Sequence, residues 1–211
     1  MTVFILTQVK LNSTRLPGKA MMLMNGKPMI QYQLEMLQQL KLAGNLVGVV
    51  STNDPAEKPI LDMCRCMKIP SFTDSPVGNT YVGYTSALKQ MGACNKDIVI
   101  RITGDCPLLT KEDIEDALVV YDYQAKKNGM KYYYNGFQGR DVEVFDYTLF
   151  TEYSTVLEKR DRWNEHAPTY IRDTYPELCY YGKMTEIKLS VDTQEEFDKV
   201  SQLICCIGDT K

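Results

Sequence analysis

Short apolar runs alternate along this chain with stretches whose apolar residues recur at the period of an α-helix. Residues 3–6, 46–50 and 97–102 are nearly continuous apolar runs, which is typical of strands buried on both faces of a parallel sheet. Between them, apolar side chains recur three or four positions apart, as at 30, 34, 37 and 40, and predict helices. This alternation favours an α/β fold, a Rossmann-like three-layer α/β/α sandwich around a mostly parallel, twisted sheet.

The second half of the chain shows a different pattern of predicted elements. Residues 131–134, 142–145, 178–181 and 187–191 are predicted as further strands, and residues 193–207 as the closing helix. We expect these strands to finish the sheet and to add a small β-rich arm over the site. Because no repeat, low-complexity tract or linker interrupts the chain, residues 1–211 are expected to form a single domain.

Composition and charge exclude several classes of protein. A net charge of −3 argues against a nucleic-acid binder with a broad basic surface. No apolar run approaches the length of a membrane span, and the first residues lack the features of a secretion signal. Seven cysteines, an odd number, indicate free thiols in a reducing compartment rather than a disulfide framework. We therefore expect a cytoplasmic protein that binds neither nucleic acid nor membranes.

The segment from Gln8 to Lys19 leaves the first predicted strand as a polar, cationic loop. In open α/β sheets, ligands bind at this carboxyl edge. Backbone N–H groups and flexible cations suit a polyphosphate, whose oxygens accept charge-assisted hydrogen bonds. The loop is neither a Walker A sequence nor a Gly-x-Gly-x-x-Gly fingerprint, so an ordinary polar turn with solvated charges is the alternative. The candidate side chains are Lys10, Ser13, Thr14, Arg15 and Lys19.

Asp105 is the first candidate for a metal ligand. It follows the strand predicted at 97–102, where Gly104 and the Cys-Pro pair at 106–107 turn the chain sharply. A carboxylate beside a phosphate loop suits Mg²⁺, which takes oxygen ligands and bridges phosphates. The alternative is a turn aspartate that binds its own backbone.

Asp192 is the second candidate for a metal ligand, at the start of the last predicted helix. It could simply cap that helix. However, Thr193 and Glu196 have the spacing of a capping box, which would leave Asp192 free to point into the site.

Three motifs resemble those of the cytidylyltransferase family. The sequence Ser-Thr-Arg-Leu-Pro-Gly-Lys at 13–19 is similar to the family's signature loop, with the usual Gln at position 8 but Lys10 in place of an arginine. Residues 101–109 and 191–197 resemble two further motifs, which carry the family's metal-binding aspartates. The family includes enzymes that make CMP-activated sugar acids and SpsF-type proteins of spore-coat polysaccharide synthesis.

The resemblance implies a nucleotide-diphospho-sugar transferase fold and a nucleotidyltransferase reaction. CMP would pass from CTP to a sugar or sugar-acid acceptor with release of pyrophosphate, in glycan or polysaccharide biosynthesis. Asp105 and Asp192 would hold Mg²⁺, while Arg15, Lys19 and Lys10 would stabilise the departing pyrophosphate. The catalytic residues implied are Lys19, Arg15 and Asp105. Related enzymes are often dimers, so a homodimer is also implied.

The resemblance further implies two sets of binding residues. The nucleotide-binding set is Gln8, Lys10, Ser13, Thr14, Gly18, Ser51, Thr52, Thr103 and Gly104. The acceptor-binding set comes from the segments around 140–145 and 165–171 and comprises Arg140, Asp141, Glu143, Glu165 and His166. For these, the alternatives are an edge strand with its charges in water and a packed, structural imidazole.

Other functions are open at this point. One alternative is a sugar-1-phosphate nucleotidyltransferase that uses another nucleotide, and a second is a non-catalytic, nucleotide-binding relative. The Lys10 exchange, and a segment 73–80 without the family's usual Arg-Gly-x-x-x-Asp-Val-Leu character, favour the second. Glycosyl transfer is the least favoured, because its common metal-binding Asp-x-Asp triplet occurs nowhere in the chain.

Overall fold

Seven strands form the main sheet of the computed structural model, which describes residues 1–75, 79–155 and 161–208. The strands are β1 (Val3–Gln8), β4 (Leu46–Thr52), β5 (Ser71–Ser75), β6 (Ile98–Thr103), β7 (Tyr132–Tyr134), β8 (Glu143–Asp146) and β9 (Cys179–Tyr181). Their order across the sheet is β5-β4-β1-β6-β8-β7-β9. Strands β5, β4, β1 and β6 run parallel, β8 is antiparallel to both neighbours, and β9 is parallel to β7.

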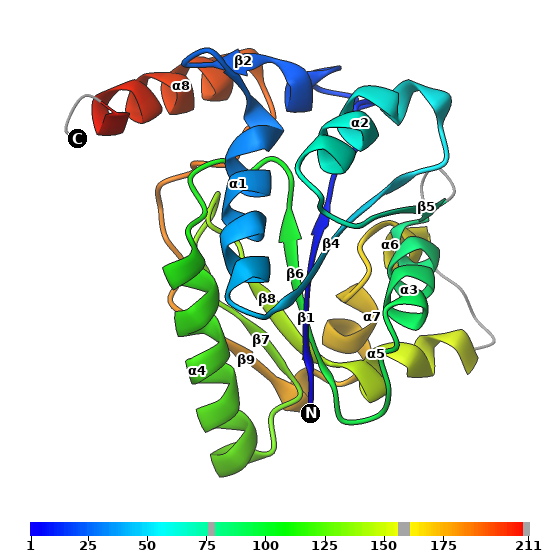
Figure 1. Ribbon diagram of the computed structural model, residues 1–211. Coiled ribbons are helices and arrows are strands. Elements are labelled where there is room, and N and C mark those ends of the chain that lie inside the picture. The colour runs from blue at the N-terminus through cyan, green and yellow to red at the C-terminus, as the bar shows by residue number, and fades with distance from the viewer. Residues whose placement is uncertain (76–78, 156–160, 209–211) are drawn as a thin grey trace.

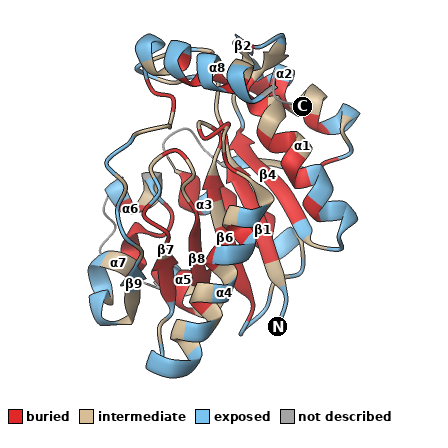
Figure 2. Ribbon diagram, turned by 90° about the vertical axis from the view of Figure 1, so that its left-hand side faces the viewer, coloured by how far each residue is buried: buried red, intermediate tan, exposed pale blue. Residues whose placement is uncertain are grey.

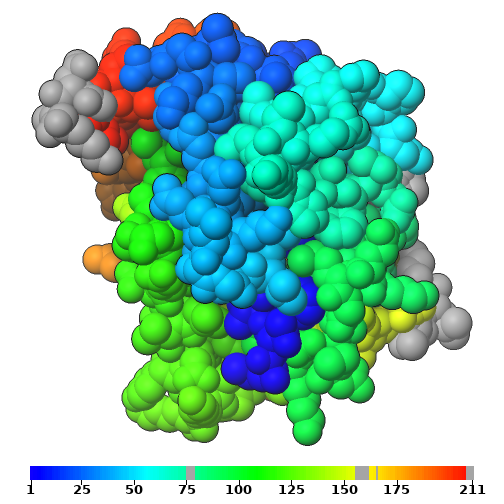
Figure 3. Space-filling model, viewed as in Figure 1, coloured from blue at the N-terminus to red at the C-terminus, as the bar shows by residue number. Residues whose placement is uncertain are grey.

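Helices cover both faces of this sheet (Figure 1). One face packs against α1 (Met29–Leu42), α2 (Lys58–Cys66) and α4 (Lys111–Asn128). The other packs against α3 (Thr80–Gln90), α5 (Tyr147–Glu152), α6 (Asp161–Glu165) and α7 (Thr169–Thr174). In β1, Ile5 lies in the first layer while Phe4 and Leu6 lie in the second, so this strand is buried on both sides. Figure 2 shows the buried strands between the two helix layers, and Figure 3 shows α1, α2 and α4 covering one face.

A third apolar cluster fastens the last helix over the carboxyl ends of the central strands. Helix α8 (Gln194–Gly208) packs Phe197, Val200 and Ile204 against Met24 and Met29. Met24 belongs to a separate two-stranded antiparallel sheet, β2 (Leu23–Met24) and β3 (Lys27–Pro28), which lies beside α8 in Figure 1. This packing brings the segment before α8 next to the loop that follows β1.

The predicted fold class is confirmed, with two differences in detail. The strands of the second half, β7, β8 and β9, all join the main sheet, and the small separate sheet lies at residues 23–28. The strand predicted at 187–191 is wrong, because the backbone of this segment bonds to two loops and not to a neighbouring strand. Its Leu189 N–H donates to Gln138 O (3.0 Å) and its Val191 N–H to Asp105 O (2.9 Å). None of the described helices combines the length and apolar character needed to cross a membrane.

A glycine allows the close contact between this segment and the loop before β8. Gly139 has φ +90°, and a Cβ there would lie 2.1 Å from the carbonyl carbon of Leu189 and 2.2 Å from the nitrogen of Ser190. Both atoms are backbone, so they cannot move aside as a flexible side chain could. Any larger residue would push away the segment that leads to Asp192.

We predict that Gly139→Ala destabilises the fold more than Gly129→Ala, its matched control. Gly129 also has a positive φ (+69°) but meets nothing within 4 Å, so an alanine there should cost only the strain of about 1 kcal/mol. At Gly139 the overpacking adds to that strain, for a total of about 3 kcal/mol. Urea unfolding measures both, and equal losses would contradict the close contact.

Candidate functional site

A cavity of about 240 Å³ opens where the carboxyl ends of β1 and β6 lie side by side. The chain places β4 and β5 on one side of β1 and β6 on the other, so this is the switch point at which open α/β sheets bind ligands. A Cβ on Gly104 would lie 2.8 Å from the Cβ of Val9, so a glycine is needed where the two strand exits meet. Predicted residues that line the cavity are Gln8, Lys10, Ser13, Thr14, Arg15, Lys19, Thr103, Gly104, Asp105, His166 and Asp192.

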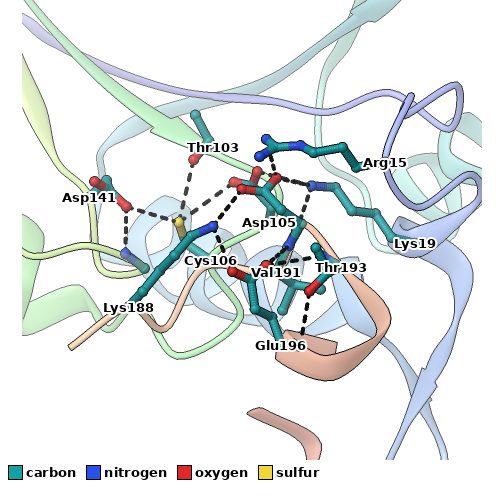
Figure 4. Close-up of polar contacts among 12 residues, drawn as sticks. Arg15, Lys19, Thr103, Asp105, Cys106, Asp141, Lys188, Val191, Thr193 and Glu196 are labelled. Atoms are coloured by element: carbon teal, nitrogen blue, oxygen red, sulfur yellow. Dashed lines mark hydrogen bonds and ion pairs between the residues drawn. The ribbon is translucent and has the colours of Figure 1, made fainter. Parts of the chain in front are cut away.

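The ammonium group of Lys19 makes three polar contacts, to two carboxylates and a backbone carbonyl (Figure 4). It donates to Asp105 Oδ2 (3.1 Å), to Asp192 Oδ1 (3.1 Å) and to the carbonyl oxygen of Val191 (2.5 Å). Lys19 begins the 3₁₀ helix η1 (Lys19–Met21), directly after Gly18 turns the chain with φ +74°. Its side chain is only 11% exposed, so its charge lies inside the protein between the two carboxylates.

Asp192 binds two further cations. Arg15 pairs with its Oδ1 at 2.8 Å and Lys188 with its Oδ2 at 2.9 Å. Burial raises the pKa of the Asp192 carboxyl, but the hydrogen bonds and charges of Lys188 and Lys19 outweigh burial and lower that pKa overall. Asp192 is therefore held as a carboxylate among three cations.

The start of α8 explains why the Asp192 carboxylate is available. Glu196 accepts hydrogen bonds from the N–H groups of Thr193 (3.0 Å) and Asp192 (2.7 Å), and the Glu196 N–H donates to the Thr193 hydroxyl (3.3 Å). This is a capping box, so the first turn of α8 is satisfied without the Asp192 side chain. Lys188, which sequence reasoning missed, joins Asp192 to Glu196 through a 2.7 Å contact with the latter.

Arg101 is a second cation that sequence reasoning missed, although it opens the motif at 101–109. It lines the cavity and donates to Gln8 Oε1 (3.1 Å), and its guanidinium pairs with the buried Glu143. Glu143 also accepts from the hydroxyl of Tyr132 (2.5 Å), and Arg172 lies 3.8 Å away. Burial raises the pKa of Glu143, but Arg101 and Arg172 outweigh it and lower the pKa overall. Glu143 is therefore a carboxylate paired with Arg101. It is not among the residues that line the cavity.

The remaining acceptor candidates occupy different surroundings. Arg140 pairs with Asp113 of α4. Asp141 accepts hydrogen bonds from the Gly139 N–H (2.6 Å) and the Tyr134 hydroxyl, and the thiol of Cys106 lies 3.4 Å from it. Neither residue lines the cavity. His166 does, whereas the side chain of Glu165 lies outside the described part of the chain.

Three nucleotide-binding candidates also lie outside the cavity lining. The hydroxyl of Ser51 donates to the carbonyl oxygen of Val9 (2.9 Å), and that of Thr52 to the carboxylate of Glu57 (3.2 Å). Gly18 contributes backbone instead, since its N–H donates to Leu11 O (2.8 Å). Ser51 and Gly18 thus bond to the backbone of the loop, and Thr52 is connected to it through Glu57.

The thiol of Cys106 is not arranged as a nucleophile. It is buried beside Asp105 and Asp141. Burial, reinforced by the two carboxylates, raises the pKa of this thiol well above its usual value. Because the thiolate is the nucleophilic form of cysteine, Cys106 stays an inert thiol.

The two candidate metal ligands are the only carboxylates described in direct contact with Lys19. Within residues 1–75, 79–155 and 161–208, no group of three or more His, Cys, Asp or Glu side chains has the geometry of a metal site. A cation bound here would therefore need oxygen ligands from a substrate in addition to Asp105 and Asp192.

The comparisons with known proteins agree on one family. The model of the family described as "Cytidylyltransferase" matches residues 4–211. An 8-amino-3,8-dideoxy-manno-octulosonate cytidylyltransferase of Shewanella piezotolerans is 26% identical over 219 residues, which cover 96% of this chain and 85% of the relative. The same-named protein of Shewanella sp. strain ANA-3 is 30% identical over 123 residues, covering 58% of this chain and 48% of the relative.

Solved structures share the fold. A cytidylyltransferase from Leptospira borgpetersenii superimposes with a TM-score of 0.83 at 24% identity, covering 97% of this chain and 87% of that one. A CMP:2-keto-3-deoxy-manno-octonic acid synthetase complexed with CTP gives a TM-score of 0.70 at 18% identity, covering 97% and 99%. At these identities the likeness concerns the fold alone.

We predict that Glu143→Gln lowers the free energy of unfolding by about 3–5 kcal/mol at neutral pH, because it leaves the buried charge of Arg101 without its partner. The folded-state pKa of Glu143 lies below its usual value of 4.5. The stabilisation is therefore complete above that value and is lost as the pH falls through the folded-state pKa.

Urea unfolding across a pH series tests this prediction, with the exposed Glu115→Gln as the control. The difference between wild type and Glu143→Gln should narrow below pH 4.5, while Glu115→Gln stays close to wild type throughout. A difference that does not change with pH would contradict the ion pair with Arg101.

Proposed function

Because the chain belongs to the cytidylyltransferase family, we propose that it transfers CMP from CTP to a sugar acid of the 3-deoxy-octulosonate kind and releases pyrophosphate. The acceptor class follows the name of the Shewanella piezotolerans relative, which aligns with 96% of this chain. The observation that carries the proposal is the position of Lys19, between Asp105 and Asp192 in a cavity at the switch point of the sheet.

The donor set fits a divalent cation. Asp105 and Asp192 approach one ammonium group from two different loops, so a positive charge already occupies the space between them. Both supply oxygen ligands, which Mg²⁺ prefers, and the phosphates of CTP would complete the coordination. Asp105 and Asp192 would hold Mg²⁺, which would neutralise phosphate charge and polarise the phosphoryl group under attack.

The cations of the loop act on the phosphates. Arg15 is 63% exposed and lies at the edge of the cavity, where it can turn from Asp192 to an incoming triphosphate. Lys10, Ser13 and Thr14 line the same wall. When an acceptor oxygen forms its bond to the α-phosphorus, the bond to the bridging oxygen breaks and the electron pair leaves with pyrophosphate. Fixed cations stabilise that charge without reorganising.

Other residues of the cavity lining are suited to an acidic acceptor. Arg101, Gln8 and His166 line the cavity, and Glu143 holds Arg101 from behind. We also keep Arg140, Asp141 and Glu165 as proposed acceptor-binding residues. Arg140 and Asp141 lie outside the cavity lining, and the structure does not describe the side chain of Glu165. No covalent intermediate is required, since Cys106 stays protonated.

The homodimer stays a prediction. Residues 1–211 are proposed as one domain because the main sheet takes strands from both halves.

The test is pyrophosphate release with Mg²⁺ and each of CTP, UTP, GTP and ATP. The acceptors are 3-deoxy-manno-octulosonate, its 8-amino form and a set of other sugar acids. We expect release with CTP only, removal of the activity by EDTA and its restoration by added Mg²⁺. Asp105→Asn should reduce the rate at least about a hundredfold, because it removes charge from the centre of the site.

The matched control for Asp105→Asn is Asp62→Asn. Asp62 is a half-buried carboxylate on α2, away from the cavity lining, that pairs only with Lys58 and Arg65 among the described residues, so this variant should keep wild-type activity. If another nucleotide supports pyrophosphate release, that nucleotide would replace CTP in the proposal. No turnover and no CTP binding by calorimetry would overturn it.

A further inference from the structure

A buried carboxylate lies against the cationic loop but outside the cavity lining. Glu57 ends the 3₁₀ helix η2 (Pro55–Glu57) just before α2, and it is 0% exposed. Among the residues that the structure describes, no lysine or arginine forms an ion pair with it. Burying a carboxylate costs free energy unless hydrogen bonds satisfy it. The groups that bind Glu57 therefore indicate why a charge is kept there.

Both oxygens of Glu57 accept the same backbone N–H group. The Leu11 N–H lies 3.1 Å from Oε1 and 2.9 Å from Oε2, and the Thr52 hydroxyl donates to Oε1 at 3.2 Å. Burial raises the pKa of the Glu57 carboxyl overall, and the hydrogen bonds from Leu11 and Thr52 limit that rise without cancelling it. A hydrogen bond to a carboxylate is stronger than one to a neutral acceptor. The loop after β1 is thus fixed by a residue that follows β4.

Leu11 is also the point at which the loop folds back on itself. Its carbonyl oxygen accepts hydrogen bonds from the N–H groups of Ser13 and Gly18, both at 2.8 Å. Leu11 is therefore bonded to Glu57 on one side and to both ends of the segment 13–18 on the other. Lys10 precedes it directly, so the position of Leu11 determines where the cations of the loop lie.

The exit of β4 holds the start of the loop as well. Ser51 donates its hydroxyl to the carbonyl oxygen of Val9, and the Val9 N–H donates to Val50 O (3.0 Å). Ser51, Thr52 and Glu57, which we call the loop brace, thus fasten the exit of β1 to the exit of β4. Ser51 and Thr52, whose hydroxyls are predicted to bind nucleotide, also contact Val9 and Glu57 through those hydroxyls.

We propose that Glu57 is a positioning residue of the nucleotide site, whose carboxylate sets the shape of residues 10–18 for binding the triphosphate. The inference rests on the proposed function, since it assumes that the loop binds CTP. Glu57 touches no reacting atom and acts through Leu11. Its removal therefore weakens contacts with the β- and γ-phosphates and leaves contacts with the nucleoside in place.

The test compares binding of CTP, pyrophosphate and CMP to wild type, Glu57→Gln and the control Asp62→Asn by calorimetry. Glu57→Gln keeps the size of the side chain and one acceptor oxygen but removes the charge. We expect the dissociation constants of CTP and pyrophosphate to rise about tenfold, the range for one charged hydrogen bond, and that of CMP to change less than about twofold. In turnover, KM for CTP should rise more than kcat falls.

Hydrogen exchange supplies a readout independent of activity. The Leu11 amide should lose protection in Glu57→Gln while the amides of β1 and β6 keep theirs. If Glu57→Gln does not fold, Thr52→Val decides, because it removes the hydroxyl that orients the carboxylate. A selective loss of CTP affinity of about threefold, relative to CMP, would support the proposal, and no loss would overturn it.

The outcomes separate this inference from the proposed function. Wild type that binds CTP, together with Glu57→Gln that binds it equally well, contradicts the role of Glu57 alone. Equal weakening of CMP and CTP would mean general damage to the fold and would also overturn the inference. Wild type that does not bind CTP would overturn the proposed function itself.

Discussion

One ammonium group joins the distant parts of this chain into a site. Lys19 comes from the loop after β1, Asp105 from the end of β6, and Val191 and Asp192 from the segment before α8. A buried charge must be paired or hydrogen-bonded to be tolerated. The need to satisfy Lys19 therefore draws three segments together, separated by as many as 173 residues along the chain.

The fold provides the conditions for this pairing. Parallel strands place the ends of β1 and β6 at one edge, and the apolar contacts of α8 with Met24 and Met29 keep the last segment over that edge. Cations from two segments line the cavity. The loop after β1, which carries several of them, is held by Glu57, and Arg101 of β6 is held by Glu143. In both cases a buried carboxylate outside the cavity positions the groups that face the cavity.

Much of this could be predicted from the sequence, because local patterns carry it. Continuous apolar runs and helical stripes gave the strands and helices of the first half, and the motif resemblance gave the family. The Thr193–Glu196 spacing predicted a capping box that the structure contains. Residues 187–191 were mistaken for a strand because an apolar run does not reveal whether its backbone faces another strand or a loop. The roles of Lys188, Arg101 and Glu57 depend on partners brought close only by the fold.

The most direct test of the central arrangement is the binding of Mn²⁺, in place of Mg²⁺, in the presence of CTP, followed by electron paramagnetic resonance. The account predicts that wild type binds the Mn²⁺–CTP pair and that Asp192→Asn binds it at least about tenfold more weakly, as expected when a metal ligand loses its charge. Glu115→Gln, which changes an exposed carboxylate, should bind like wild type. Wild-type affinity in Asp192→Asn would contradict the claim that the carboxylates around Lys19 form the catalytic centre.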